Sequence, residues 1–181
     1  MNYSSISDKA SIIEGLSAAV DEVNNYVMGL SQKDFEFAPP GKWNAGQQLD
    51  HLIRSIKPLN LAYALPVIIL KLKFGLTNRP SKTFPALVEK YERKLTEGGR
   101  ASGRFIPEQV PYEAKEKLCR LYAKEKNKLN DKVDRFEEEA LDKYILPHPL
   151  LGKLTLREML FFTIYHNGHH LALMRKYNTG F

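Results

Sequence analysis

Apolar residues recur at helical spacing in several long segments of the chain. In the first, residues 8–30, they form a narrow stripe of Ile13, Leu16, Val20, Val23, Val27 and Leu30. A narrow apolar stripe on an otherwise polar segment is typical of a helix that packs in a bundle. Similar stripes predict helices over residues 44–73, 112–136 and 155–177. We therefore predict an all-α protein built as a four-helix bundle.

Capping residues and prolines set the expected helix ends. Ser7 is a candidate cap for the first helix, and Asn44 for the second. Thr155 followed by Glu158 three residues later matches a capping box for the last helix. Pro58 and Pro66 interrupt the second segment, so that helix either kinks there or gives way to a second helical piece.

The connection over residues 74–111 is rich in glycine and proline, and a connection of this length is usually functional or mobile. We expect one short helix inside it, over residues 85–97. No segment of the chain shows a convincing strand pattern. At 181 residues, the sequence is expected to form a single domain over residues 1–181.

Composition is that of an ordinary globular protein, with 43% hydrophobic and 27% charged residues. Its most apolar run, Leu59 to Leu70, is too short to cross a bilayer. The single cysteine, Cys119, cannot form an internal disulfide, and we expect no secretory leader. These features predict a cytoplasmic protein without a membrane partner. Cys119 itself is interpreted as a packed or surface thiol.

The net charge of +6 comes from one segment, because residues 71–104 hold nine Lys or Arg against three Asp or Glu. This segment is either a solvated connection or a rim that attracts anionic substrates. No nucleic-acid-binding motif accompanies it, so no nucleic-acid partner is expected.

Histidine provides the strongest indication of chemistry. His166 and His170 are four residues apart and share one face of the last predicted helix, although His166 and His169 are also neighbours. The inward face of this helix is predicted to carry His166 and His170, which favours them as the pair. That face consists of Met159, Phe162, Thr163, His166, His170, Leu173 and Tyr177. His51, in the middle of the second helix, adds a third imidazole on a facing element.

Three neutral imidazoles suit a divalent transition metal such as zinc or nickel. Because structural zinc sites have four protein ligands, a set of three predicts an open, catalytic position. We therefore predict that His51, His166 and His170 bind a metal, with His169 at the edge of the same face.

Four other residues call for interpretation. His148, between two prolines, is expected to be structural or exposed unless its loop folds over the site. Trp43 is interpreted as a hydrophobic anchor rather than a substrate contact. Asp50 should point away from the site, because adjacent helix positions diverge. Glu125 falls on the apolar side of its helix and is unusual there.

Two stretches resemble a known family. Residues 43–52 read WNAGQQLDHL, and residues 148–159 read HPLLGKLTLREM, followed by HNGHH at 166–170. Together they resemble the DinB-like (DinB/YfiT) superfamily of metal-dependent hydrolases. The resemblance implies an up-down-down-up bundle, a frequent homodimer, and nickel or zinc bound at the positions of His51, His166 and His170. Related enzymes transfer low-molecular-weight thiols such as bacillithiol, or catalyse mycothiol-dependent isomerisation.

Several functions stay open at this point. One is an enzyme that activates either a thiol, as an S-transferase, or water, as a hydrolase. An anionic thiol would suit the basic segment, and the lack of a well-placed carboxylate base favours thiol chemistry. A second is a non-catalytic metal-binding or stress-related bundle. A third is attachment of residues 59–74 to a membrane surface, although that segment can equally complete a bundle core.

Overall fold

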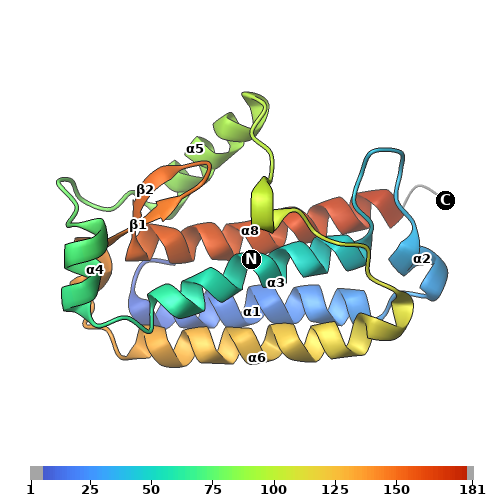
Figure 1. The fold of residues 1–181 in the computed structure, drawn as a ribbon, viewed down its shortest axis with the longest axis horizontal. Helices are drawn as coiled ribbons and strands as arrows, with labels where there is room; N and C mark the ends of the chain where they lie inside the picture. The colour runs from blue at the N-terminus through green and yellow to red at the C-terminus, as the bar shows by residue number, and fades with distance from the viewer. Residues whose placement is uncertain (1–5, 179–181) are drawn as a thin grey trace.

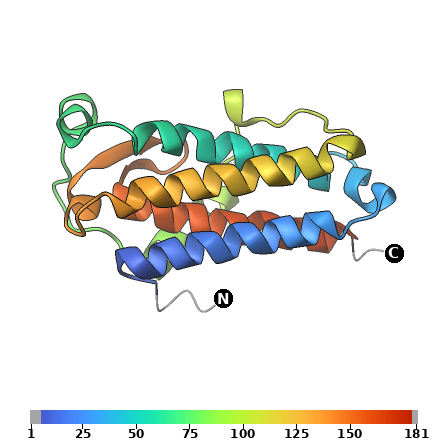
Figure 2. The same cartoon turned by 90° about the horizontal axis from the view of Figure 1, so that it is seen from below.

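Four long helices lie side by side along the molecule in the computed structural model, which describes residues 6–178 (Figures 1 and 2). They are α1 (Lys9–Met28), α3 (Ala45–Ala62), α6 (Lys115–Asp134) and α8 (Leu156–Asn178). Their facing sides form the hydrophobic core, in which residues such as Val20, Leu49, Leu129 and Leu160 are fully buried. The chain is therefore mostly helical, which confirms the all-α class.

Contacts between helix ends give their relative directions. Lys115, at the start of α6, donates hydrogen bonds to the carbonyls of Met28 and Leu30 at 3.1 and 2.8 Å, beyond the end of α1. α1 and α6 are therefore antiparallel. Tyr63, after the end of α3, donates to the carbonyl of Leu156 at the start of α8, at 2.6 Å. α3 and α8 are therefore antiparallel too.

The predicted caps are confirmed for two of the three helices. Asn44 accepts the N–H of Gln47 at 2.8 Å and starts α3. Thr155 and Glu158 form the reciprocal capping box at the start of α8. At α1 the prediction of Ser7 was wrong by one residue. Asp8 is the cap, because its carboxylate accepts the N–H of Ser11 at 2.7 Å while the Ser11 hydroxyl caps in return.

The second predicted helix is two helices. α3 continues through Pro58 and ends at Ala62, and α4 (Val67–Phe74) begins after Pro66, bent by 108° from α3. Within residues 6–178 no single helix has the length and apolarity to cross a membrane. Only α3 and α4 taken together meet that requirement, by length and composition. α4 stands at one end of the molecule (Figure 1), where Leu70 is buried but Ile68 and Leu72 are 55% and 76% exposed.

A β-hairpin precedes α8, although the sequence predicted no strand. β1 (Ile145–His148) pairs antiparallel with β2 (Gly152–Thr155), so that Ile145 lies opposite Thr155 and His148 opposite Gly152. The buried residues are adjacent in each strand, Ile145 with Leu146 and Leu154 with Thr155, so the hairpin lacks the alternation by which a strand is recognised in a sequence. Gly152 has a φ of 75°, a conformation that favours glycine and permits the tight return of the chain. Two further helices were also not predicted, α2 (Gln32–Glu36) and α7 (Ala140–Lys143).

The middle connection contains the predicted short helix, α5 (Phe84–Thr96), and two 3₁₀ turns, η2 (Gly103–Phe105) and η3 (Tyr112–Ala114). The third long helix therefore begins at Lys115 rather than at Tyr112. α5 lies against α8 (Figure 1), where the rings of Tyr91 and Phe162 are 5.2 Å apart. The connection is thus packed onto the bundle over α8.

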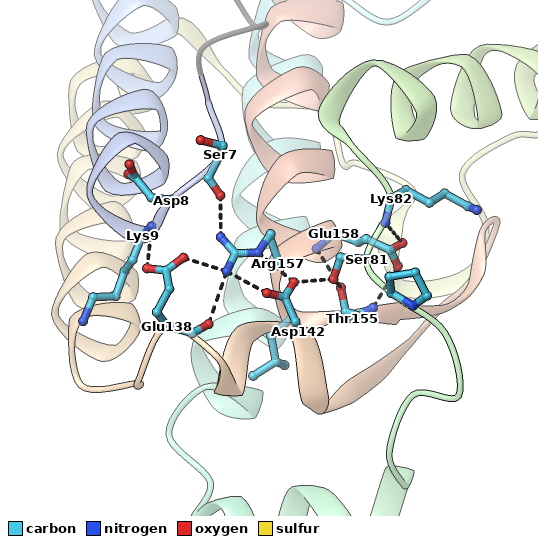
Figure 3. Close-up of polar contacts among 12 residues, drawn as sticks. Ser7, Asp8, Lys9, Ser81, Lys82, Glu138, Asp142, Thr155, Arg157 and Glu158 are labelled. Atoms are coloured by element: carbon cyan, nitrogen blue, oxygen red, sulfur yellow. Dashed lines mark hydrogen bonds and ion pairs between the residues drawn. The ribbon is translucent and has the colours of Figure 1, made fainter.

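A partly buried polar network fastens this connection to the start of α8 (Figure 3). Glu158 is fully buried and accepts both terminal nitrogens of Arg79, at 2.6 and 2.8 Å, and the N–H of Lys82 at 2.7 Å. Arg157, beside it, pairs with Asp142 and Glu138. Arg79 therefore stabilises the packing of the middle connection against α8. This part of the basic segment is not a solvated connection.

Candidate metal centre

The structure brings the three predicted histidines together between α3 and α8. His51, His166 and His170 are each only 5% exposed. The Nε2 atom of His166 lies 3.2 Å from that of His51 and 2.9 Å from that of His170. Among the described residues this is the group of histidine, cysteine and acidic side chains with the geometry to hold a metal ion.

The second ring nitrogen of two of these histidines is fixed by an oxygen atom. His51 Nδ1–H donates to the carbonyl of Phe105 at 2.7 Å, and His170 Nδ1–H donates to the side-chain oxygen of Gln48. Carbonyl and amide oxygens only accept hydrogen bonds, so Nδ1 carries the proton in both rings. Their Nε2 lone pairs therefore point toward a common place with His166.

This donor set fits a divalent transition metal. With metal–nitrogen bonds of about 2.0–2.1 Å, neighbouring ligands lie about 2.8–3.0 Å apart in an octahedral shell and about 3.3–3.4 Å apart in a tetrahedral one. The two Nε2 separations, 2.9 and 3.2 Å, fall within the span of these values. Metal-binding histidines usually donate the hydrogen of their second ring nitrogen to an oxygen atom, as Nδ1 of His51 and His170 do here.

Burial keeps the three rings in the neutral form that a metal requires. It lowers the pKa of His166 and His170 well below the ordinary value, and mutual repulsion among the histidines adds to this. Burial also lowers the pKa of His51, although the bond to Phe105 opposes it. The site therefore does not need to lose protons near pH 7 before it binds a cation.

A cavity of about 730 Å³ opens beside the three imidazoles. Besides α3 and α8, its walls come from α5, η2 and the β-hairpin. All seven residues of the predicted inward stripe of α8 line it: Met159, Phe162, Thr163, His166, His170, Leu173 and Tyr177. That stripe therefore faces a space large enough for a small-molecule ligand.

The charges that line this cavity are all positive. Lys42, Arg100 and Arg104 contribute to its wall, whereas no described aspartate or glutamate does. Asp50 points away as predicted, since it accepts hydrogen bonds from Arg54 at 2.6 Å and from the N–H of Glu108 at 3.0 Å. Two arginines of the predicted basic segment therefore belong to a rim around the site.

Trp43 corrects one prediction. Its ring is half-buried, lines the cavity and lies 5.1 Å from the ring of His51, with a stacked arrangement on His170 at 6.3 Å. It is therefore a wall of the site rather than a core anchor. Its sequence position could have indicated this role, because Trp43 lies just before the cap of α3, the helix that carries His51.

Two groups that the sequence marked as unusual have structural roles. Glu125 is buried, accepts a hydrogen bond from Asn60 at 2.8 Å and pairs with Lys128 at 2.7 Å. Cys119 is buried, and burial raises the pKa of its thiol to about 11. Cys119 was expected to be a packed or surface thiol and is packed, and neither residue lines the cavity.

His148 and His169 both line the cavity. His148 ends strand β1 rather than lying in a loop, and the hairpin places its ring 4.3 Å from that of Phe162. His169 is half-buried at the edge of the inward face, 5.8 Å from the ring of Tyr91.

Gln48 and the carbonyl of Phe105 were missed as partners of the histidines. Gln48 lies three residues before His51, so helical spacing placed it on the same face of α3. A backbone carbonyl in a long connection gives no sequence signal.

Comparison with known families agrees with this site. The sequence matches the family model of the DinB superfamily over residues 15–174, a range that contains all three clustered histidines. The resemblance noted from the sequence is thereby confirmed. No curated protein matches the chain.

The metal-free protein should lose stability as the pH falls from 6.5 to 5. Burial lowers the pKa of folded His148 from 6.5 to about 4, and the pKa values of the three clustered rings fall in the same direction. The unfolded chain therefore takes up protons first, and acid favours it. We expect the free energy of unfolding, measured with urea, to fall by about 2 kcal/mol for His148 alone. A value that stays constant over this range would contradict the neutral, buried state of these rings.

Proposed function

We propose that this chain, which belongs to the DinB superfamily, is a metal-dependent enzyme that activates a small anionic thiol for transfer to an electrophile. The observation that carries the proposal is the cavity beside the three imidazoles, which has cationic and apolar walls and no described carboxylate. A purely structural metal site would not need such a space. This favours an enzyme over a non-catalytic metal-binding protein.

His51, His166 and His170 would hold the ion, for which their neutral nitrogens make zinc or nickel the best candidates. Bound there, such an ion would supply Lewis acidity, which favours the thiolate form of a thiol. Gln48 and the Phe105 carbonyl keep two rings in the orientation that this requires. Three protein ligands leave room for a substrate atom.

The cavity wall supports a thiol over water as the activated group. Metal-dependent hydrolysis commonly relies on a nearby general base, and no described aspartate or glutamate lines this cavity. A thiolate needs no further base once its proton is lost, and it attacks an electrophilic carbon directly while the leaving group departs. Arg100 and Arg104 would attract the anionic part of such a thiol. Hydrolysis, with His169 as base, is the alternative.

The helix directions support the topology that the resemblance implies. α1 and α6 are antiparallel, as are α3 and α8. Arg157 near the start of α8 donates to the carbonyl of Ser7, just before α1. Arg175 near the end of α8 pairs with Glu22 in the second half of α1 at 3.0 Å, so these two contacts favour a parallel pair. We propose the up-down-down-up bundle on this basis.

Replacement of His166 or His170 by alanine should abolish stoichiometric metal binding. Protein purified without an affinity tag and loaded with zinc or nickel should carry one ion per chain, and each variant should carry almost none. His169→Ala is the matched control, because it removes a neighbouring imidazole of the same helix that lies outside the cluster. Elemental analysis of the dialysed proteins measures this. Equal metal content in wild type and His166→Ala would remove the site assignment.

Turnover should require both metal and thiol. With cysteine and 1-chloro-2,4-dinitrobenzene, the metal-loaded protein should form the aryl thioether at least about tenfold faster than the metal-free protein, since a lower thiol pKa raises the thiolate fraction. The assay follows product absorbance, with His166→Ala as the control. Faster metal-dependent hydrolysis of 4-nitrophenyl acetate than thioether formation would favour the hydrolase. Absence of both activities would leave a non-catalytic protein.

We also propose that the chain forms a homodimer through α4 and the end of α3. Leu61, Ile68 and Leu72 are 73%, 55% and 76% exposed there, and burial against a second copy would remove them from water. Leu72→Asp should therefore convert a dimer to a monomer in sedimentation velocity. Ile106→Asp is the matched control, because Ile106 is 52% exposed on a different element. A monomeric wild type, or a dimer that survives Leu72→Asp, would contradict this interface.

A further inference from the structure

His148 has one ring nitrogen committed to the β-hairpin. Its Nδ1 atom faces the backbone N–H groups of Leu150 and Leu151, both at 3.1 Å. Because an N–H group can only donate, Nδ1 accepts both hydrogen bonds. The hydrogen of the neutral ring must then be on Nε2. Lys90 holds the same turn through a bond of 2.7 Å to the carbonyl of Leu151.

The other ring nitrogen of His148, Nε2, is available to a ligand. His148 is one of the lining residues, and its Nε2 has no hydrogen-bond partner among residues 6–178. It is also absent from the buried polar atoms without a partner in that part of the chain, which are the oxygens of Asn24 and Asn130. The Nε2–H group is therefore accessible, and it belongs to a residue that lines the cavity.

A phenylalanine lies between this group and the clustered histidines. The Phe162 ring is 4.3 Å from the ring of His148 and 4.8 Å from the ring of His166. His148 and the metal centre therefore flank one aromatic side chain within one cavity. A ligand that reaches past Phe162 would meet both.

The ring is held in a neutral state. Burial, helped by the charge of Lys90, lowers the pKa of His148 to about 4. At neutral pH the ring is thus a donor with a fixed direction, and its only free hydrogen-bonding atom cannot accept. A ligand group placed there must be an acceptor, because a second donor would be left unpaired in a partly buried place.

We propose that His148 Nε2–H binds the carboxylate of a small thiol whose sulfur is held at the three-histidine site. This rests on the proposed function, and it adds a second point of recognition. Arg100 and Arg104, which also line the cavity, favour a carboxylate over a neutral carbonyl as the acceptor. His148 would thereby distinguish acidic thiols from neutral thiols of similar size.

Two substitutions of His148 test the roles of its two ring nitrogens separately. In His148→Asn the amide oxygen can replace Nδ1 and keep the bonds from Leu150 and Leu151, while the cavity donor is lost. In His148→Gln the amide N–H can reach the place of Nε2. Binding is followed in the cobalt-loaded protein through the thiolate absorption band, with 3-mercaptopropionate as the acidic probe and 2-mercaptoethanol as the neutral probe.

We expect His148→Asn to raise the Kd for 3-mercaptopropionate about tenfold and to leave that for 2-mercaptoethanol within about twofold, as loss of one hydrogen bond to a charged group implies. His148→Gln should restore part of the preference. Metal content should stay at the wild-type level in both variants. Equal loss of affinity for the two thiols, no loss for either, or loss of the metal in His148→Asn would overturn the proposal.

A second measurement separates this proposal from the metal site. Nitrogen-15 NMR of the metal-free protein should show His148 as the Nε2–H tautomer from about pH 5.5 to 8, with Nε2 shifted by added propionate. If the wild-type protein binds no metal, the proposed function fails. The Nε2–H signal of His148 and its response to propionate would still show that this ring donates a hydrogen bond to a carboxylate. A proton on Nδ1, or no response to propionate, would contradict the donor role even in a protein that binds metal.

Discussion

Three buried imidazole nitrogens that meet at one place form the constraint on which the structure depends. The Nε2 lone pairs of His51 and His170 both face His166, whose ring can donate an Nε2–H to only one of them, so the arrangement leaves a buried acceptor without a donor and does not stabilise the fold by itself. His166 approaches both His51 and His170 through Nε2 at 3.2 and 2.9 Å. The surrounding structure must therefore hold the rings in place. A cation at the common point would turn this cost into stabilisation.

The elements around the site provide that support from several parts of the chain. Gln48 and the Phe105 carbonyl orient two of the rings, one from within α3 and one from η2. α5 covers α8 through aromatic contacts, and the Arg79–Glu158 pair fastens the start of that connection. The β-hairpin completes the wall with His148. Residues far apart in sequence thus form one cavity in which metal, thiol and carboxylate could be recognised together.

Helical spacing was sufficient to predict the centre of the site. The four-residue interval between His166 and His170, and the position of His51 within an apolar stripe, place three imidazoles on facing helices. Caps at Asn44 and Thr155 followed from local hydrogen bonding, which needs only neighbouring residues. The inward stripe of α8 was predicted in the same way, but the rest of the wall could not be. His148 and the Phe105 carbonyl reach the site through the paths of connections, which depend on packing between distant segments. The hairpin was missed because the buried residues of each strand are adjacent and do not alternate with exposed ones.

We propose that three histidines of this chain hold one metal ion and leave a position for substrate. X-ray absorption spectroscopy of the zinc- or nickel-loaded protein measures the ligand shell of that ion. We expect three imidazole nitrogens at about 2.0–2.1 Å, together with light scatterers that a sulfur atom replaces when a small thiol is added. A shell closed by four imidazoles, or one unchanged by replacement of His166 and by thiol, would contradict it.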